Sequence, residues 1–153
     1  MRAIFEPFCT VLEAHTAKAA VELCAAAPPD LIIADLTLPY QNGEFLLANL
    51  RAGSRDMQLT PLILLTPHDD ARPDHALAAD DYLSRPFNAR ELLSRGHMQL
   101  QLGKRRRDLE ARFEERTAEL QALMDESPMG IIRIAPTGEL TYANSEWWVQ
   151  LGS

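Results

Sequence analysis

One short stretch, residues 29 to 39, constrains the fold of this chain more than any other. Residues 31–34 are apolar and include two β-branched residues, prolines bound the stretch on both sides, and Asp35 follows the apolar run directly. Such a run indicates a strand buried on both faces, as inside a parallel sheet. In open α/β sheets the carboxyl ends of the strands border the ligand crevice, which places Asp35 for chemistry. The alternative is an Asp that caps a loop, since Asp is common where strands end.

Up to residue 97 the chain alternates between predicted strands and helices. In order, we predict the end of a helix at 2–8, a strand at 9–14, a helix at 15–27, the strand at 31–35, a helix at 43–51, a strand at 62–66, a weak helix in the seventies, a strand at 81–84 and a helix that opens at Asn88. Asn88 is a good N-cap, and Glu91 three residues later suits a capping box. The alternation predicts βα units and a parallel sheet.

Three motifs in this order resemble those of response-regulator receiver domains. Asp35 is followed by Leu-Thr-Leu-Pro and then Asn42-Gly43, residues 61–66 end in the hydroxyl residue Thr66, and residues 80–87 read Asp-Asp-Tyr-Leu-Ser-Arg-Pro-Phe. The resemblance covers about residues 1 to 100. It implies an α/β fold with a flavodoxin-like parallel sheet of strand order 2-1-3-4-5. We assign residues 1–97 to this receiver-like domain.

The resemblance also implies roles for individual residues. Asp35 would accept a phosphoryl group, Thr66 would hydrogen-bond it, and Tyr82 would change rotamer with Thr66. Arg85 stands where the family has Lys; it keeps the charge but brings a planar fork instead of a compact ammonium. Without the resemblance, Thr66 and Tyr82 read as a strand-end Thr and a half-buried Tyr.

The family further implies Mg²⁺, held by the Asp35 carboxylate and the backbone carbonyl of Thr37, and a histidine kinase or phosphotransfer protein as phosphodonor. Mg²⁺ prefers oxygen ligands in an octahedron. A receiver opens with a strand ending in two acidic residues, and this sequence begins after that point. The acidic partners of Asp35 are therefore absent, and the expected site is incomplete.

The same missing strand affects the predicted sheet, because in the family it lies between the strands at 9–14 and 31–35. Each backbone group left unpaired in the interior costs about 1–3 kcal/mol. We therefore expect that the chain does not make a normal receiver fold alone. Either Met1 is an internal methionine of a longer product, or the strand at 9–14 shifts to pair directly with the strand at 31–35.

Residues 67–75 depart from the family by being shorter and rich in proline. We expect a stunted fourth helix there, which makes output through this face doubtful. His68 and His75 sit among acids and could suggest a metal, but scattered loop histidines are usually solvated. Pro86, as in the family, could follow a cis peptide bond, although cis is the minority form in general.

Residues 98–125 form a predicted helical linker. Its apolar positions step by fours and threes when two arginines take the intervening places, which is coiled-coil spacing: Leu102, Arg106, Leu109, Phe113, Arg116, Leu120 and Leu123. We expect a homodimer through this seam; the alternative is an amphipathic helix lying on its own domain. The basic run at 104–107 could attract nucleic acid, but we interpret it as a solvated helix face and expect no nucleic-acid partner.

Residues 126–153 predict a hairpin, with a Pro-Thr-Gly turn between two alternating segments, and then a helix that begins at Asn144 and carries Trp147 and Trp148. This segment resembles the opening of a PAS sensor domain, of which about a quarter is present. An isolated hairpin is marginal in water, so the tryptophans would have little core to enter.

Composition sets the remaining limits. The net charge is −7, and no apolar run has the length of a membrane span, so we expect a cytoplasmic protein. Cys9 and Cys24 lie on apolar-rich segments, which favours buried free thiols. We predict a phosphorelay receiver module in a fragment of a sensor histidine kinase that carries no kinase core. The rival is a phosphate-independent, degenerate receiver that serves for dimerisation; an enzyme is a distant third.

Overall fold

The computed structural model describes residues 1–35, 43–67 and 79–152, with the side chains of 43 and 44 excepted. The chain divides into two compact units, residues 1–107 and residues 108–153. Thr37, His68, His75 and the weak helix expected in the seventies lie outside the described residues. None of the helices that the structure describes combines the length and the apolar character needed to cross a membrane.

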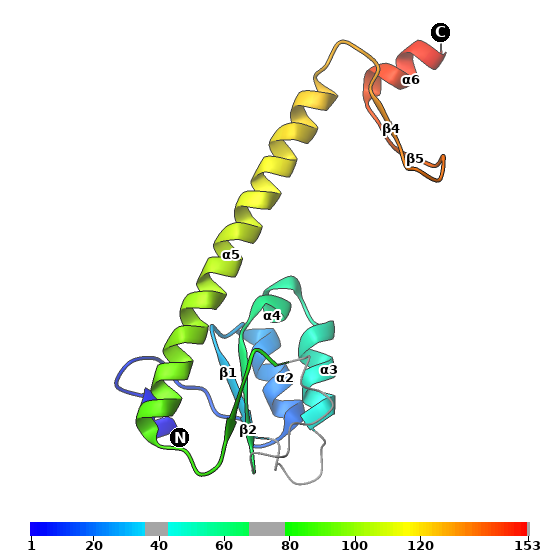
Figure 1. Ribbon diagram of the computed structural model, residues 1–153. Helices are drawn as coiled ribbons and strands as arrows, with labels where there is room; N and C mark the ends of the chain where they lie inside the picture. Colours follow the sequence, from blue (N-terminus) through cyan, green and yellow to red (C-terminus); the bar gives the residue numbers. More distant parts are fainter. Residues whose placement is uncertain (36–42, 68–78, 153) are drawn as a thin grey trace. The chain divides into compact units, whose positions relative to one another are not determined.

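The first unit is built on three parallel strands in the order β1-β2-β3 (Figure 1). They are β1 (Ile32–Asp35), β2 (Leu62–Thr66) and β3 (Asp81–Ser84). Every residue of β2 is buried, because strands flank it on both sides and helices cover both faces. These strands are the ones predicted at 31–35, 62–66 and 81–84, and their order matches the 3-4-5 portion of the flavodoxin-like sheet.

Helices form a layer on each face of this sheet. The helices of the first unit are α1 (Arg2–Phe5), α2 (Ala17–Ala26), α3 (Gly43–Ala52), α4 (Arg55–Leu59) and the first part of α5 (Ala89–Asp125). On one face α2 and α3 enclose an apolar cluster that includes Leu47, Leu50 and Leu64. On the other face Leu92 of α5 packs with Ile63 and Leu65, and Phe5 of α1 closes that cluster. The expected α/β fold with a parallel sheet is confirmed.

The covering helix α5 packs closely at two glycines, against α1 at Gly96 and against the start of β2 at Gly103. Leu92, Gly96, Gln99 and Gly103 form its buried stripe. A Cβ at Gly96 would lie 3.1 Å from the Phe5 ring, and one at Gly103 would lie 2.8 Å from Cδ of Pro61, just before β2. Since real Cβ atoms essentially never lie within 3.0 Å of such an atom, the absence of a side chain at Gly103 sets the separation between α5 and the start of β2.

The strand predicted at 9–14 is wrong, and so is its proposed direct pairing with β1. Within the described residues, positions 10–14 take no regular structure, and Leu12 is 58% exposed. The amides of Phe8 and Cys9 both donate to the Phe5 carbonyl, closing a turn after α1. A strand needs a neighbour for its backbone groups, and no described strand lies beside this segment.

Other local predictions had mixed outcomes. The predicted N-cap is confirmed, because Asn88 Oδ1 accepts from the Glu91 amide at 2.8 Å. Thr16, which was not predicted as a cap, accepts from the Ala19 amide at the start of α2. The short helix α4 was not predicted; its signal was Ser54, which caps it. Both cysteines are free, but only Cys24 is buried, with its thiol pKa raised by desolvation, whereas Cys9 is exposed.

The second unit contains the last turns of α5, the antiparallel pair β4 (Ile132–Ile134) and β5 (Leu140–Ala143), and α6 (Ser145–Gly152). The turn between the strands needs glycine, because Gly138 has φ +88°. The predicted hairpin and helix start are therefore present. Trp148 is 57% exposed, in line with the small core expected around the tryptophans.

Asn144 holds this unit together. Its side chain is almost fully buried, with Oδ1 accepting from the amides of Ile131 and Trp147, and Nδ2 donating to the carbonyls of Met124 and Met129. One amide side chain thus joins the end of α5, the following loop, the hairpin and the start of α6. Nearby, a hydrogen bond from Tyr142 to Asp125 raises the pKa of the Tyr142 phenol.

Replacing Gly103 by Ala tests the close approach of α5. We expect the overpacking cost, about 1–3 kcal/mol, to exceed the gain of about 1 kcal/mol that Ala has over Gly within a helix. Urea unfolding followed by far-UV circular dichroism measures the difference. The neighbouring exposed substitution Lys104→Ala is the control and should change stability by less than about 0.5 kcal/mol. A Gly103→Ala variant more stable than the parent would contradict this packing.

Candidate functional site

The candidate site lies at the carboxyl edge of the sheet, where three parallel strands end side by side. Asp35 ends β1, Thr66 ends β2, and Ser84 ends β3 with Arg85 directly after it. The register pairs Asp35 with Leu65 and Thr66 with Ser84, so the three ends are level within one residue. Parallel pairing therefore brings Asp35 close to Thr66 and Arg85, which follow it by 31 and 50 positions in the chain.

Arg85 is the residue that joins the strand ends. Its guanidinium donates to Oδ2 of Asp35 in an ion pair, and its backbone amide donates to the Thr66 carbonyl at 2.9 Å. The Asp35 side chain is 20% exposed and that of Arg85 49% exposed, so a solute can reach the guanidinium. The Arg85-Pro86 peptide bond is cis.

The other two residues of the predicted site differ in their surroundings. Thr66 is 4% exposed at the end of the central strand, one register position from Asp35. Tyr82 lies in the interior of β3, opposite Leu64, and packs on the apolar cluster beneath α2 and α3. The structure therefore brings Asp35, Thr66 and Arg85 to one edge, while Tyr82 sits two residues inside its strand and half buried.

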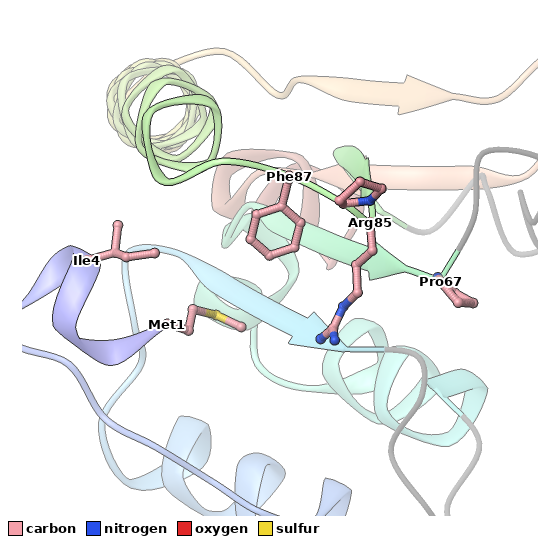
Figure 2. Close-up of a pocket in the computed structure, with 6 residues that line it drawn as sticks. Met1, Ile4, Pro67, Arg85 and Phe87 are labelled. Atoms are coloured by element: carbon pink, nitrogen blue, oxygen red, sulfur yellow. The ribbon is translucent and has the colours of Figure 1, made fainter.

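A pocket of about 520 Å³ opens beside Arg85. Its walls come from α1 and from the segments that follow β2 and β3: Met1, Ile4, Pro67, Arg85, Pro86 and Phe87. Figure 2 shows the Arg85 side chain reaching from the end of β3 toward the end of β1. The walls are mostly apolar with one cation, which suits a small anionic group at the mouth. Sequence reasoning did not single out Met1, Ile4 or Phe87, whose positions depend on how α1 packs.

The described residues at this edge offer few of the oxygen ligands that Mg²⁺ needs. Mg²⁺ usually takes one or two carboxylates plus waters and phosphate oxygens in an octahedron. In the described part of the chain no group of three or more His, Cys, Asp or Glu side chains is placed to hold a metal ion. Asp35 supplies one carboxylate, already paired with Arg85. The described residues by themselves therefore do not fit a magnesium site.

Sequence reasoning missed an ionic cluster at the opposite, amino-terminal edge of the sheet. There Asp80, just before β3, accepts hydrogen bonds from Arg51 and Arg106. The only signal in the sequence was the Asp80-Asp81 pair ahead of a buried strand. Because this cluster lies at the other end of the strands from Asp35, it is not part of the candidate site.

Comparisons with known proteins agree with this geometry. The family model described as response regulator receiver domain matches residues 1–96. The sensor histidine kinase TmoS of Ectopseudomonas mendocina is 36% identical over 83 residues, which are 50% of this chain and 8% of that protein. The regulatory protein VanR of Enterococcus faecium is 35% identical over 94 residues, which are 60% of this chain and 39% of VanR. The chain thus spans well under two thirds of either relative.

One solved structure extends the comparison to the fold. The receiver domain of a sensor histidine kinase from Pseudomonas aeruginosa, described with a magnesium ion coordinated in its active-site cleft, superposes with a TM-score of 0.58. It is 24% identical, and the match covers 65% of this chain and 84% of that one. At this identity the likeness concerns the fold.

Proposed function

This chain belongs to the response regulator receiver family, the receiver domains of two-component phosphorelay systems, and from this we propose that Asp35 is its phosphoacceptor. The single observation that carries the proposal is the ion pair between Arg85 and Asp35 at the carboxyl edge of the sheet, beside Thr66. A carboxylate at that edge, with a fixed cation on it, is the arrangement that phosphoryl transfer to a carboxylate needs.

The chemistry assigns a task to each side chain. An Asp35 oxygen attacks the phosphorus of the donor, the bond from phosphorus to the donor breaks, and an aspartyl phosphate remains. Two anions repel during this approach, and the Arg85 guanidinium offsets the repulsion by turning from the carboxylate to the phosphoryl oxygens, which its fork matches. The Thr66 hydroxyl then hydrogen-bonds the phosphoryl group, and Tyr82 adjusts its rotamer. No step is assigned to Mg²⁺, because the described donors do not form its site.

Phosphorylation by a small phosphodonor tests the proposal. We expect little labelling of the 153-residue chain with acetyl phosphate and Mg²⁺, because Asp35 is the one acidic ligand described at the edge. Adding an N-terminal strand that ends in two acidic residues should produce a shifted band on a phosphate-affinity gel. Asp35→Asn should abolish the band, and Asp56→Asn, at an exposed acid of α4, should leave it. A band that survives Asp35→Asn would rule out Asp35.

The surroundings of the receiver are also proposals. Residues 1–97 would be the receiver, residues 98–125 a helical linker and residues 126–153 the opening of a PAS domain, within a cytoplasmic hybrid or receiver-headed sensor histidine kinase. The match of this chain to part of TmoS and the hairpin anchored by Asn144 support this arrangement. The phosphodonor would be a histidine kinase or a phosphotransfer protein.

A second candidate function, a dimerising module that works without phosphate, is favoured by an apolar stripe on α5. Four residues of the stripe are at least 62% exposed: Leu109, Phe113, Leu120 and Leu123. Exposed apolar side chains at coiled-coil spacing are stabilised by burial against a second helix. Arg116 interrupts the stripe, so the affinity should be modest. A second copy of the chain is the partner that this spacing fits.

Sedimentation velocity across a concentration series tests this candidate. We expect the parent chain to shift toward dimer and Leu109→Ala/Leu120→Ala to remain monomeric. Each Leu→Ala substitution removes roughly 2–3 kcal/mol of the free energy that burial of the leucine would contribute to the dimer. The matched control is Glu114→Ala/Gln121→Ala, one position beyond two stripe residues, which should dimerise like the parent. If the parent itself remains monomeric at high micromolar concentration, the stripe does not serve for dimerisation.

A further inference from the structure

The amino-terminal edge of the sheet gathers arginines from both helical layers. The chain enters the three strands at Asp30, at Thr60 and Pro61, and at Asp80. Arg51 reaches this edge from α3, and Arg106 and Arg107 reach it from α5. The helices α3 and α5 lie on opposite faces of the sheet (Figure 1), so side chains from the two helices can share a partner only around its edge.

Asp80 is the shared partner. Its Oδ2 accepts from Arg51 Nη2 at 3.0 Å and from the Leu62 amide at 2.8 Å, and its Oδ1 accepts from Arg106 Nη1 at 2.6 Å. The side chain is only 10% exposed. Burial alone would raise the pKa of this carboxyl, but the hydrogen bonds from Arg106 and the Leu62 amide, with the charges of Arg106 and Arg51, hold its pKa below the ordinary value.

Arg107 makes the second set of contacts. Its Nη1 donates to Asp30 Oδ1 at 2.9 Å, and its Nη2 donates to the Pro29 carbonyl at 3.1 Å and to Thr60 Oγ1 at 3.2 Å. Thr60 is fully buried, and its carbonyl accepts from Arg51. The two arginines of α5 therefore contact the entry points of all three strands, and both share a partner residue with Arg51.

The adjacent cations behave differently. Lys104 and Arg105 are exposed, as expected for a solvated face, and make no ion pair among the described residues. Arg106 and Arg107 instead turn to the sheet, one turn after Gly103 has brought the helix against Pro61. The sequence-based interpretation of the whole run as solvated is therefore wrong for Arg107, which is 28% exposed, and incomplete for Arg106, which is 43% exposed but pairs with Asp80.

We infer that Arg106 and Arg107, bound to Asp80 and Asp30, form an electrostatic lock that holds the exit of α5 against the strand entries and couples it to α3 through Arg51. The last residues before the boundary between the two compact units are these two arginines. Opening the lock frees the final turns of α5 in the first unit without removing its apolar anchors at Leu92 and Gly96. The lock thus determines whether residues 100–107, the end of α5 within the first unit, stay helical or fray.

Hydrogen–deuterium exchange of the full chain tests the lock. In Arg106→Gln/Arg107→Gln we expect the amides of residues 100–107 to exchange roughly tenfold faster than in the parent, a change that corresponds to about 1.4 kcal/mol. The matched control Lys104→Gln/Arg105→Gln removes the same charge from the same turn and should leave these amides within about twofold. Amides of the central strand β2 report whether either variant is globally destabilised.

The salt dependence of exchange tests the same ion pairs without any substitution. Raising NaCl from 50 mM to 1 M should speed exchange at residues 100–107 of the parent toward the rate in Arg106→Gln/Arg107→Gln, and should change that variant little, because screening weakens ion pairs. Equal acceleration in the two double variants, or a parent whose exchange here ignores salt, would overturn the inference. Neither result would bear on phosphorylation at Asp35, which lies at the other edge.

The pH dependence of stability isolates Asp80. A carboxyl whose pKa is lowered on folding stabilises the protein above the unfolded-state pKa of about 3.9, and this contribution disappears as the pH falls through the folded-state pKa. The stability difference between the parent and Asp80→Asn should therefore be complete at pH 6 and shrink below about pH 4. Arg51 and Arg106, the charged groups that face Asp80, remain protonated throughout. A difference that is constant from pH 6 to pH 3 in urea unfolding would contradict the ionised role of Asp80.

Discussion

The pairing of β2 with a parallel strand on each side is the constraint from which the rest of the first unit follows. A strand whose backbone groups are all used by its neighbours can be buried on both faces, and β2 is. Burial on both faces demands two helical layers, which α2 and α3 supply on one side and α5 on the other. Parallel pairing also aligns all strand entries at one edge and all strand exits at the other. The Asp35–Arg85 pair and the Asp80 cluster of the first unit lie at these two edges, where charged side chains can reach water or one another.

The arginine–aspartate ion pairs at the two edges of the sheet differ in how exposed the carboxylate is to solvent. At the exit edge Arg85 is half exposed, and its ion pair with Asp35 is open to solutes. At the entry edge Asp80 is nearly covered, and its carboxylate accepts three hydrogen bonds from other parts of the first unit, so it stabilises the fold. Exposed ion pairs contribute about 0–1 kcal/mol, whereas hydrogen bonds to a charged group contribute about 1.5–3 kcal/mol. The same pair of residue types is therefore accessible to solutes at one edge and nearly covered at the other.

Prediction from the sequence succeeded where a signal is local. The apolar runs at 31–35 and 62–66 predicted strands, and both form, but only β2 is buried throughout, whereas β1 is mostly half-buried. Asn88 caps a helix through its own side chain. It failed at residues 9–14, because strand formation depends on a neighbour and not on composition alone. The edge that joins Asp35, Thr66 and Arg85 followed from family resemblance and topology together. The contacts of Arg106 and Arg107 could not be foreseen, since they depend on how closely Gly103 lets α5 approach Pro61.

Asn144 restricts which sequences can fill the second unit. Its amide oxygen receives two N–H groups and its amide nitrogen serves two carbonyls, all within a buried site. Aspartate would match its shape but could donate nothing to the carbonyls of Met124 and Met129, while leucine would match its volume and satisfy none of the four groups. Glutamine would carry the right amide one methylene too far. Among variants selected only for folding of this unit, position 144 should therefore tolerate a narrower range of side chains than the tryptophans that follow it.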